Sequence, residues 1–460
     1  MHEMDTFRIN DKDNVCVNLA TGHKTALCDI QEGAEIIKYG YPIGKASKDI
    51  ATGECVHSHN MRTALGDILS YEYSPEYTEL STKEPFTINA FVRKNGDIGI
   101  RNDIWIVPTV GCVNSIAKQL AEKTGAIHFA HPYGCSQLGD DQHITQLILR
   151  GLIKHPNAGG VLVLGLGCEN NNIAEMKKVL GTTDEERVKF LCVQECEDEI
   201  REGIKLIDEL KKTAAEDARS EVPVSKLKIG LKCGGSDGFS GITANAVVGR
   251  VTDEICAMGG TAVLTEVPEM FGAETVLFKR CVSKNVFDKS VALINNFKLY
   301  FKNHGQPVSE NPSPGNKEGG ITTLEEKSLG CVQKGGSAPI VDVLDYGDTL
   351  TRSGLNLLNG PGNDIVSITN LAAVGCHLVL FTTGRGTPLG GAVPTVKIAS
   401  NDTISALKPH WIDYSAYGFD KEKKAEELLD LIRRVADGEQ TKNETNGNCE
   451  IAIFKDGVTL

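Results

Sequence analysis

From residue 88 onward, short apolar runs alternate with helix-length segments, and this alternation most limits what the chain can fold into. The first set of strand-length runs is 104–110, 126–130, 160–166 and 188–193, and helix-like segments occupy 114–122, 143–154, 173–180 and 195–214. Parallel strands need a long crossover connection, which is usually a helix. The order therefore predicts a doubly wound, mostly parallel α/β domain.

A charged stretch at residues 214–226, broken by Pro223, separates this set from a second one of the same style. Strands are expected at 227–231, 261–264, 339–344 and 377–383, and helices at 243–258, 270–283, 286–303 and 421–437. Between them, residues 306–320 (QPVSENPSPGNKEGG) contain three prolines and three glycines and are expected to form a loop. Long ordered loops inside compact domains are often functional.

The first 70 residues follow a different pattern, in which short β-like runs alternate with glycine turns. Regular turn spacing of this kind predicts a small all-β module. Residues 70–86 have little periodicity and are expected to form a linker. The sequence thus predicts a small all-β module at 1–80, a first α/β domain at 81–222 and a second at 223–460.

The acidic composition restricts the partners of this chain. A net charge of −13 and a pI near 5.4 argue against nucleic acid and against an anionic membrane surface. We see no basic stretch followed by an apolar core at the N-terminus and no apolar run long enough to span a bilayer, so we expect a cytoplasmic protein. In that compartment the 14 cysteines are expected to be free thiols or metal ligands.

Five polar or glycine-rich turns follow predicted strands, and ligands of parallel sheets bind beyond the carboxyl ends of strands. We therefore expect one shared pocket. The turns are 110–114, 131–135, 165–170, 233–243 and 383–387. Four of them contain a cysteine, and Cys112, Cys135 and Cys168 form a candidate iron or iron–sulfur site, because thiolates suit iron. The alternative for each cysteine is a small buried hydrophobic residue.

The run at 231–246, LKCGGSDGFSGITANA, is the turn with the clearest chemistry. It joins a strand to the start of a helix through two glycines, which is how α/β folds build anion sites from free N–H groups and the helix dipole. Gly234, Gly235, Ser236 and Asp237 are its candidate ligand-binding residues. A tight turn with a Ser or Thr cap is the alternative.

Histidines in the all-β module suggest a second kind of site. His57 and His59 are two residues apart, so on a strand they point to the same face. With His23 as a third ligand they predict a divalent-metal site that acts as a Lewis acid. The alternative is a pair of partly exposed strand histidines.

Three further side chains are candidates for catalysis. His131 ends an apolar strand and is the candidate general base, although a histidine in that position equally suits a hydrogen bond to a backbone carbonyl. Lys317 and Arg385 are candidate carboxylate-binding groups, and arginine offers a bidentate fork.

With these residues in view, the chain resembles the altronate/galactarate dehydratase family over almost its whole length. The matching segments are GHKTALCDI, IKYGYPIGKA, HSHN, GDIGIRND, TVGCVNSIA, YGCSQLGDD, GLGCENNN, LKCGGSDGFSGITAN, TEVPEMFGAE, ENPSPGNKEGGITTLEEKSLG, LNLLNGPGND and FTTGRGTPLGG. Three of them (HSHN, YGCSQLGDD and TEVPEMFGAE) look like the altronate form. The resemblance adds Arg101, Asn102, Asn316, Gly384 and Gly386 as substrate-binding candidates.

The resemblance implies a β-clip module of the SAF type followed by two α/β domains. It also implies iron-dependent dehydration of D-altronate to 2-dehydro-3-deoxy-D-gluconate in hexuronate catabolism, with Fe²⁺ as cofactor and Mn²⁺ or an iron–sulfur cluster as alternatives. The alternative activities are dehydration of galactarate or a related sugar acid, and sulfo-lyase action on a hydroxy sulfonate. A non-catalytic sugar-acid binding protein is the alternative of another class. The expected partner is a small sugar acid, and a homo-oligomer is left open.

Overall fold

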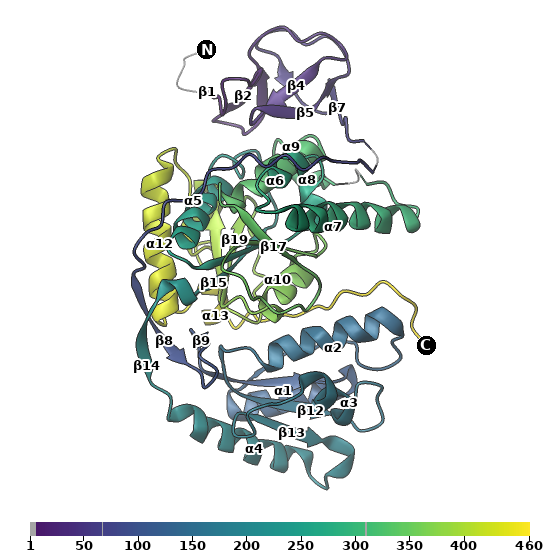
Figure 1. The fold of residues 1–460 in the computed structure, drawn as a ribbon, viewed down its shortest axis with the longest axis vertical. Coiled ribbons are helices and arrows are strands. Elements are labelled where there is room, and N and C mark those ends of the chain that lie inside the picture. The colour runs from purple at the N-terminus through teal and green to yellow at the C-terminus, as the bar shows by residue number, and fades with distance from the viewer. Residues whose placement is uncertain (1–5, 67, 309–310) are drawn as a thin grey trace.

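The computed structural model describes residues 6–66, 68–308 and 311–460, which form three units arranged along the long axis of the molecule (Figure 1). The expected fold class is confirmed: a small all-β module precedes two α/β units with parallel sheets. In Figure 1 the β-module lies at the top, the second α/β unit in the middle and the first at the bottom. The C-terminal α/β unit therefore lies between the other two.

The β-module (residues 6–62) consists of two small antiparallel sheets. Val15, Ile36 and Ile43 point between them and are almost completely buried. One sheet has the order β1-β2-β3-β6, with β1 (Thr6–Phe7), β2 (Val15–Asn18), β3 (Lys24–Ala26) and β6 (Cys55–Val56). The other has the order β4-β5-β7, with β4 (Glu35–Lys38), β5 (Tyr41–Ala46) and β7 (Met61–Arg62).

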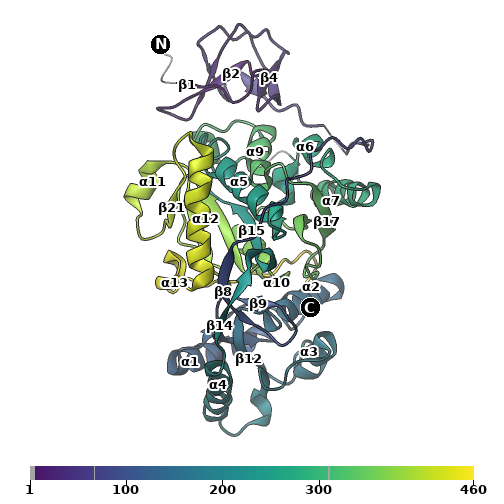
Figure 2. The same ribbon diagram turned by 60° about the vertical axis from the view of Figure 1, so that its left-hand side comes forward.

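A linker (residues 68–86) runs from the β-module along the side of the second α/β unit and is held there by ring contacts and backbone hydrogen bonds. Tyr71 meets Phe278 edge-on, with ring centroids 4.8 Å apart. The Glu76 N–H donates to the carbonyl of Lys279 at 2.7 Å. The linker ends in β8 (Thr87–Val92), which forms a separate sheet of order β14-β8-β9 with β9 (Ile98–Gly99) and β14 (Arg219–Pro223). Figure 2 shows this sheet between the two α/β units.

The first α/β unit (residues 103–215) has a four-stranded parallel sheet of order β11-β10-β12-β13. Its helices pack on both faces and bury residues such as Leu120, Leu149 and Leu210. The elements are β10 (Asp103–Pro108), α1 (Asn114–Thr124), β11 (Ile127–His128), α2 (Gly139–Ile153), β12 (Ala158–Gly165), α3 (Ile173–Leu180), β13 (Val188–Cys192) and α4 (Glu199–Ala215), with 3₁₀ turns at Gly111–Val113 and Val193–Glu195.

The second α/β unit (residues 224–460) has a seven-stranded parallel sheet of order β17-β18-β16-β15-β19-β20-β21. Its strands are β15 (Lys228–Cys233), β16 (Thr261–Leu264), β17 (Ile340–Leu344), β18 (Gly354–Leu358), β19 (Leu378–Thr383), β20 (Thr395–Ala399) and β21 (Tyr414–Ser415). Its helices are α5 (Ala244–Ala257), α6 (Glu274–Phe278), α7 (Lys284–Asn303), α8 (Pro314–Glu318), α9 (Leu324–Cys331), α10 (Asp364–Ala373), α11 (Asp402–Leu407), α12 (Lys421–Asp437) and α13 (Lys442–Thr445), with 3₁₀ turns at Val224–Lys226, Val267–Met270 and Val332–Gly335.

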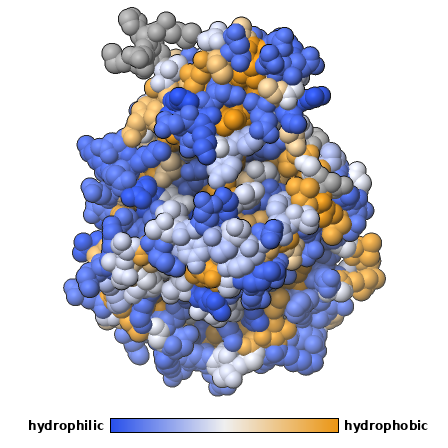
Figure 3. All heavy atoms as spheres, turned by 45° about the horizontal axis from the view of Figure 1, so that its top comes forward, coloured by the Kyte–Doolittle hydropathy of each residue, from blue (hydrophilic) through white to orange (hydrophobic). Residues whose placement is uncertain are grey.

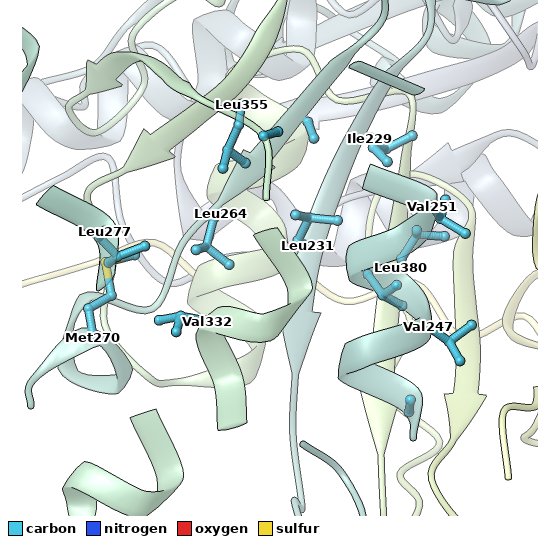
Figure 4. Close-up of a cluster of buried hydrophobic side chains, with 14 of the residues drawn as sticks. Ile229, Leu231, Val247, Val251, Leu264, Met270, Leu277, Val332, Leu355 and Leu380 are labelled. Carbon is cyan, nitrogen blue, oxygen red and sulfur yellow. The ribbon is translucent and has the colours of Figure 1, made fainter. Parts of the chain in front are cut away.

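The centre of this sheet is apolar on the face that α5 covers. Figure 4 shows Leu231 and Leu380 from neighbouring strands facing Val247 and Val251 of α5, and all four are fully buried. Burial of each such side chain contributes roughly 1.5–3 kcal/mol. The core thus holds β15 and β19 side by side, and the loops that follow these two strands emerge from a rigid base.

The two ends of β19 face different neighbours. At its start, the carbonyl of His377 accepts a hydrogen bond from the Asn157 amide of the first α/β unit at 2.8 Å. Its far end, at Thr383, leads into a loop that packs against Asp237. The first α/β unit therefore meets the amino ends of the second sheet, whereas the β-module lies near its carboxyl ends (Figure 1).

The division into residues 1–80, 81–222 and 223–460 stays a prediction. The surface seen from the β-module end is mostly hydrophilic, with scattered hydrophobic patches (Figure 3). Over the described ranges, no helix combines the length and the apolar character needed to cross a bilayer.

Candidate active site

The glycine loop (residues 234–243) follows β15 and offers donors for an anion. Gly235 adopts a φ of 64°, which favours glycine. Among the described residues, none accepts a hydrogen bond from the backbone N–H of Gly235 or Ser236. The Ser236 hydroxyl is buried and has no protein partner. Two backbone N–H groups and one hydroxyl therefore remain for a ligand.

Asp237 has a different role from the one expected of a ligand-binding carboxylate. It accepts hydrogen bonds from the backbone of Phe239 and Ser240 and from the side chains of Ser240, Ser400 and Asn401, at 2.8–3.1 Å. A Cβ on Gly384 would lie 2.4 Å from its Cγ. The prediction that Asp237 and Gly384 bind substrate is therefore not supported by their contacts, which join two loops instead.

The Arg385 loop (residues 383–387) follows β19. Gly386, with a φ of 79°, donates its N–H to the Thr383 hydroxyl at 2.9 Å and so closes the turn. The Arg385 guanidinium is 48% exposed and reaches across to the carbonyl of Gly315 at 3.2 Å and to Glu318 at 3.1 Å. The Arg385 Cβ lies 3.5 Å from the Cβ position of Gly235, so this loop packs directly beside the glycine loop.

The proline loop (residues 311–320) contains the short helix α8, which the sequence did not predict. Ser313 and Asn316 form a reciprocal capping box. The Asn316 amide donates to the carbonyl of Ser236 at 2.8 Å, so Asn316 positions the glycine loop. The side chain of Lys317 is exposed. Among the described residues, none accepts a hydrogen bond from its ammonium group, which is available to an anion.

The β-module reaches the same place through two buried lysines. Lys24 donates to Glu326 at 2.7 Å and to the carbonyl of Gly320 at 2.8 Å, and Lys38 donates to the other Glu326 oxygen at 2.9 Å. Despite burial, the two ammonium groups lower the pKa of Glu326 to about 2. A narrow cavity of about 10 Å³ lies between Lys38 and the glycine loop. It is large enough for roughly one water molecule. The junction is therefore closed behind the loop.

Two of the three predicted metal ligands lie together at this junction. The rings of His23 and His57 are 5.2 Å apart between centroids. Nε2 of His57 lies 2.9 Å from the carbonyl oxygen of Lys317, and burial lowers the pKa of His57. His59 is 51% exposed and lies 4.0 Å from Glu54. The structure thus pairs His23 with His57 and leaves His59 apart.

The loops of the first α/β unit form a group of their own. Gly111 donates to the carbonyl of Tyr133 at 2.9 Å, and Asn171 donates to that of Gly134 at 3.0 Å. The three thiols of Cys112, Cys135 and Cys168 are exposed. The hydrogen bonds of the described residues link these loops to one another and not to the glycine loop. The expectation of one pocket shared by all five turns is therefore wrong.

His131 is held by backbone groups on both sides of its ring. Its Nε2 lies 2.8 Å from the carbonyl of Pro108, and its Nδ1 accepts from the Tyr133 N–H at 3.2 Å. The residue is buried, and burial lowers its pKa. These contacts match the backbone-partner alternative and leave no ring nitrogen for a substrate proton.

Arg101 and Asn102 hold domains together. Arg101 donates to both oxygens of Glu444, at 2.6 and 2.9 Å, and its other donors reach three backbone carbonyls. Asn102 accepts from Arg93 at 2.9 Å and donates to the carbonyl of Ala214 at 2.8 Å. Neither has a free donor toward a substrate, so their predicted role in substrate binding is not supported.

A buried ionic network lies beneath the glycine loop; sequence reasoning pointed to Glu266 and Glu269 as possible ligands but did not predict their lysine and cysteine partners. Its carboxylates and ammonium groups pair closely: Lys232 contacts Glu266 and lies 2.8 Å from Asp364, and Lys327 lies 2.8 Å from Glu269. The remaining members are Cys233, Cys331 and Lys334. The available signal was the pair of charged segments KCGG and TEVPEM directly after two apolar strands.

Ligand distances test both predicted metal sets. Over the described ranges, the one group with three ligand atoms within 4.8 Å of one another is Cys233, Glu269 and Cys331. The Lys334 ammonium lies 2.8 Å from the Cys233 sulfur, and Lys327 already neutralises Glu269. These cations oppose a metal ion there. His23 and His57 remain the better-placed nitrogen donors.

Comparisons with known proteins agree with this architecture. The model for the altronate/galactarate dehydratase SAF domain matches residues 17–64, that for the D-galactarate dehydratase/altronate hydrolase second domain matches 90–215, and that for the D-galactarate/altronate dehydratase C-terminal domain matches 224–459. The chain is 53% identical to altronate dehydratases of Escherichia coli (strain K12) and Bacillus subtilis (strain 168), in each case over 96% of this chain and 93% of the relative. It is 32% identical to the galactarate dehydratase (L-threo-forming) of Escherichia coli (strain K12) over 93% of this chain and 84% of that protein. The chain belongs to the D-galactarate/altronate dehydratase family.

Proposed function

We propose that the protein removes water from D-altronate to form 2-dehydro-3-deoxy-D-gluconate. The similarity to altronate dehydratases is much higher than that to a galactarate dehydratase, which favours altronate over galactarate. The structural observation that carries the proposal is the convergence of three elements at one junction. Free N–H groups of the glycine loop, the half-exposed Arg385 and the His23–His57 pair are linked by contacts through the proline loop.

The chemistry needs a carboxylate-binding site because the proton at C2 of a sugar acid is a weak acid. Negative charge builds up on the carboxylate as that proton leaves, and aimed donors stabilise it. The N–H groups of Gly235 and Ser236, with the guanidinium of Arg385, supply such donors. Lys317 lies on the same side and suits the polyol or the carboxylate.

The family implies iron, and two imidazole donors fit a divalent ion. His23 and His57 would hold Fe²⁺, with Mn²⁺ as the alternative. When bound, the ion supplies a Lewis acid that neutralises the carboxylate or assists departure of the C3 hydroxide. The exposed thiols of Cys112, Cys135 and Cys168 are the alternative, as ligands of an iron–sulfur cluster.

The test is turnover by anaerobically purified protein supplied with Fe²⁺ and D-altronate, followed by detection of a 2-keto-3-deoxy acid. Galactarate and 2-sulfolactate are run in parallel. We expect product from altronate at a kcat/KM at least tenfold above that from galactarate. Turnover of galactarate or release of sulfite without turnover of altronate would refute the assignment. Binding of a sugar acid without turnover of any would identify a non-catalytic binding protein.

A further inference from the structure

We propose that Asp364 is the general base that takes the C2 proton, and that Lys232 positions it. This inference rests on the proposed function. Asp364 is the first residue of α10 and follows the N-cap Asn363. A Cβ on Gly234 would lie 2.7 and 2.9 Å from the two Asp364 carboxylate oxygens. The carboxylate therefore lies directly against the start of the glycine loop, beside the free Gly235 N–H.

Asp364 is the solvent-exposed member of the otherwise buried ionic network. The charged side chains of Lys232, Glu266 and Lys334 are at most 1% exposed, whereas the Asp364 side chain is 35% exposed. Lys232 lies 2.8 Å from Asp364 Oδ1. Within the described part of the chain, no donor hydrogen-bonds to Oδ2. One oxygen is thus fixed by the ion pair, and the other is left for a ligand.

The position fits proton removal next to a bound carboxylate. A substrate carboxylate held by the N–H groups of Gly235 and Ser236 would bring its α-carbon, C2, to the end of the loop against which Asp364 packs. A general base must lie within hydrogen-bond reach of the proton that it removes. Oδ2 of Asp364, 2.7 Å from the Cβ position of Gly234, is a basic atom placed at this end of the loop.

The step balances without an oxidant or reductant. The C2–H bond breaks, its proton passes to Oδ2 of Asp364, and its electron pair forms the C2–C3 double bond as the C3–O bond breaks. The leaving hydroxide takes up one proton and departs as water. The resulting enol becomes the 2-keto acid when its hydroxyl proton is lost and C3 gains a proton.

Two other groups that could take a proton are already engaged. Lys397 is buried, and its pKa is lowered by burial to about 8, but its ammonium donates to the carbonyls of Thr387 and Leu389. The thiol of Cys233 is buried between Lys334 and Glu269. Asp364 combines partial exposure with a free oxygen, which these groups lack.

The test compares Asp364→Asn with Asp402→Asn. Asp402 is a matched control because it also begins a helix directly after an asparagine N-cap, in α11, and it contacts Ser415 rather than the network. We expect Asp364→Asn to lower kcat by about 10²- to 10⁴-fold, with KM changed less than about threefold. Asp402→Asn should retain wild-type kcat. In a single turnover with C2-deuterated altronate, Asp364→Asn should show a larger isotope effect than wild type.

The outcomes separate this inference from the proposed function. If wild-type protein does not dehydrate altronate, the proposed function fails. If wild type is active and Asp364→Asn keeps its kcat within about threefold, Asp364 is not the base. A rise in KM with unchanged kcat would also overturn the inference and assign Asp364 to binding. Should Asp364→Asn fail to fold, Asp364→Ser serves the same comparison, and partial recovery of kcat in Asp364→Glu would support a carboxylate base.

Discussion

Nε2 of His57 donates a hydrogen bond to the backbone carbonyl oxygen of Lys317, 2.9 Å away, across the boundary between the β-module and the second α/β unit. Because a carbonyl oxygen only accepts, the proton of the neutral ring lies on Nε2. Nδ1 then carries the lone pair, which the Ser58 hydroxyl approaches at 3.0 Å. One contact thus fixes the tautomer and the docking of the module, and a metal ion at Nδ1 would have to replace the Ser58 hydroxyl.

Replacement of His57 by alanine should lower metal-dependent activity by at least about 100-fold, because the variant loses a ligand and a contact to the proline loop. His59→Ala should stay within about threefold of wild type, since His59 is half-exposed beside Glu54. Steady-state kinetics and bound-iron analysis of both variants decide the point. Equal losses in the two variants would restore the three-histidine site.

Arg385→Gln should raise KM for altronate by roughly 10- to 100-fold, because a charge-assisted donor contributes about 1.5–3 kcal/mol. Arg352→Gln is the matched control, since the Arg352 side chain is 60% exposed, lies 3.8 Å from Asp342 and donates to the carbonyl of Val341 at 3.3 Å. Initial rates over a range of altronate concentrations give both constants. An unchanged KM in Arg385→Gln would remove this residue from the substrate site.

Glu326→Gln should destabilise the protein by about 3–5 kcal/mol, because it leaves the buried ammonium groups of Lys24 and Lys38 without a counter-charge. The pKa of Glu326 is lowered from an ordinary 4.5 to about 2, so its ionised form stabilises the folded protein. Its stabilisation is complete above pH 4.5 and is lost as the pH falls toward 2. Urea unfolding between pH 7 and pH 3 measures this. Glu318→Gln, at an exposed position, should change neither the free energy of unfolding nor its dependence on pH.

Acid should weaken the junction of the two α/β units through His155. This histidine is buried against His377, and burial lowers its pKa to about 3. In the unfolded chain His155 takes up a proton near pH 6.5, whereas in the folded chain it stays neutral down to about pH 3. The free energy of unfolding therefore falls as the pH drops from 6.5 toward 3. His155→Asn should flatten the dependence of the unfolding free energy on pH over that range. An unaltered slope would show that other groups control it.

Iron chemistry at the cysteine loops is tested apart from the histidines. If iron is held by His23 and His57, Cys168→Ser should keep its iron content and at least about half of its activity. The ultraviolet–visible spectrum of the anaerobic wild-type protein should then lack sulfide-to-iron absorption. A cluster spectrum that disappears in Cys168→Ser would move the iron to the first α/β unit.

Much of the second sheet was predictable because buried parallel strands form continuous apolar runs. The predicted strand at 261–264 coincides with β16, and the predicted helix at 421–437 coincides with α12. β18 (Gly354–Leu358) was not predicted, since its sequence GLNLL contains a buried asparagine. The helix predicted at 270–283 spans only Glu274–Phe278 in the structure, and Gly272, with a φ of 86°, accounts for its late start.

The sequence predicted which kinds of turn and side chain the candidate site contains more accurately than it predicted which of them lie together. The glycine loop, Arg385 and Lys317 lie at one junction, and their sequence signal was a polar turn after an apolar strand. The same signal occurs around His131 and Cys135, which belong to another sheet. Local sequence carries no information on which end of one sheet meets the next unit. The contact between Lys24 and Glu326 spans 302 residues and is likewise invisible to local patterns.

Because the contact between Lys24 and Glu326 joins two separate units, the linker at residues 68–86 determines how often the two sides meet. At this junction, Lys24 and Lys38 of the β-module pair with Glu326 of the second α/β unit, and all three charges are buried. Burying these charges is favourable only when all of them are paired. A covalent tether of this length holds the β-module at an effective concentration in the millimolar range. The tether therefore lowers the entropic cost of docking the β-module against the glycine loop.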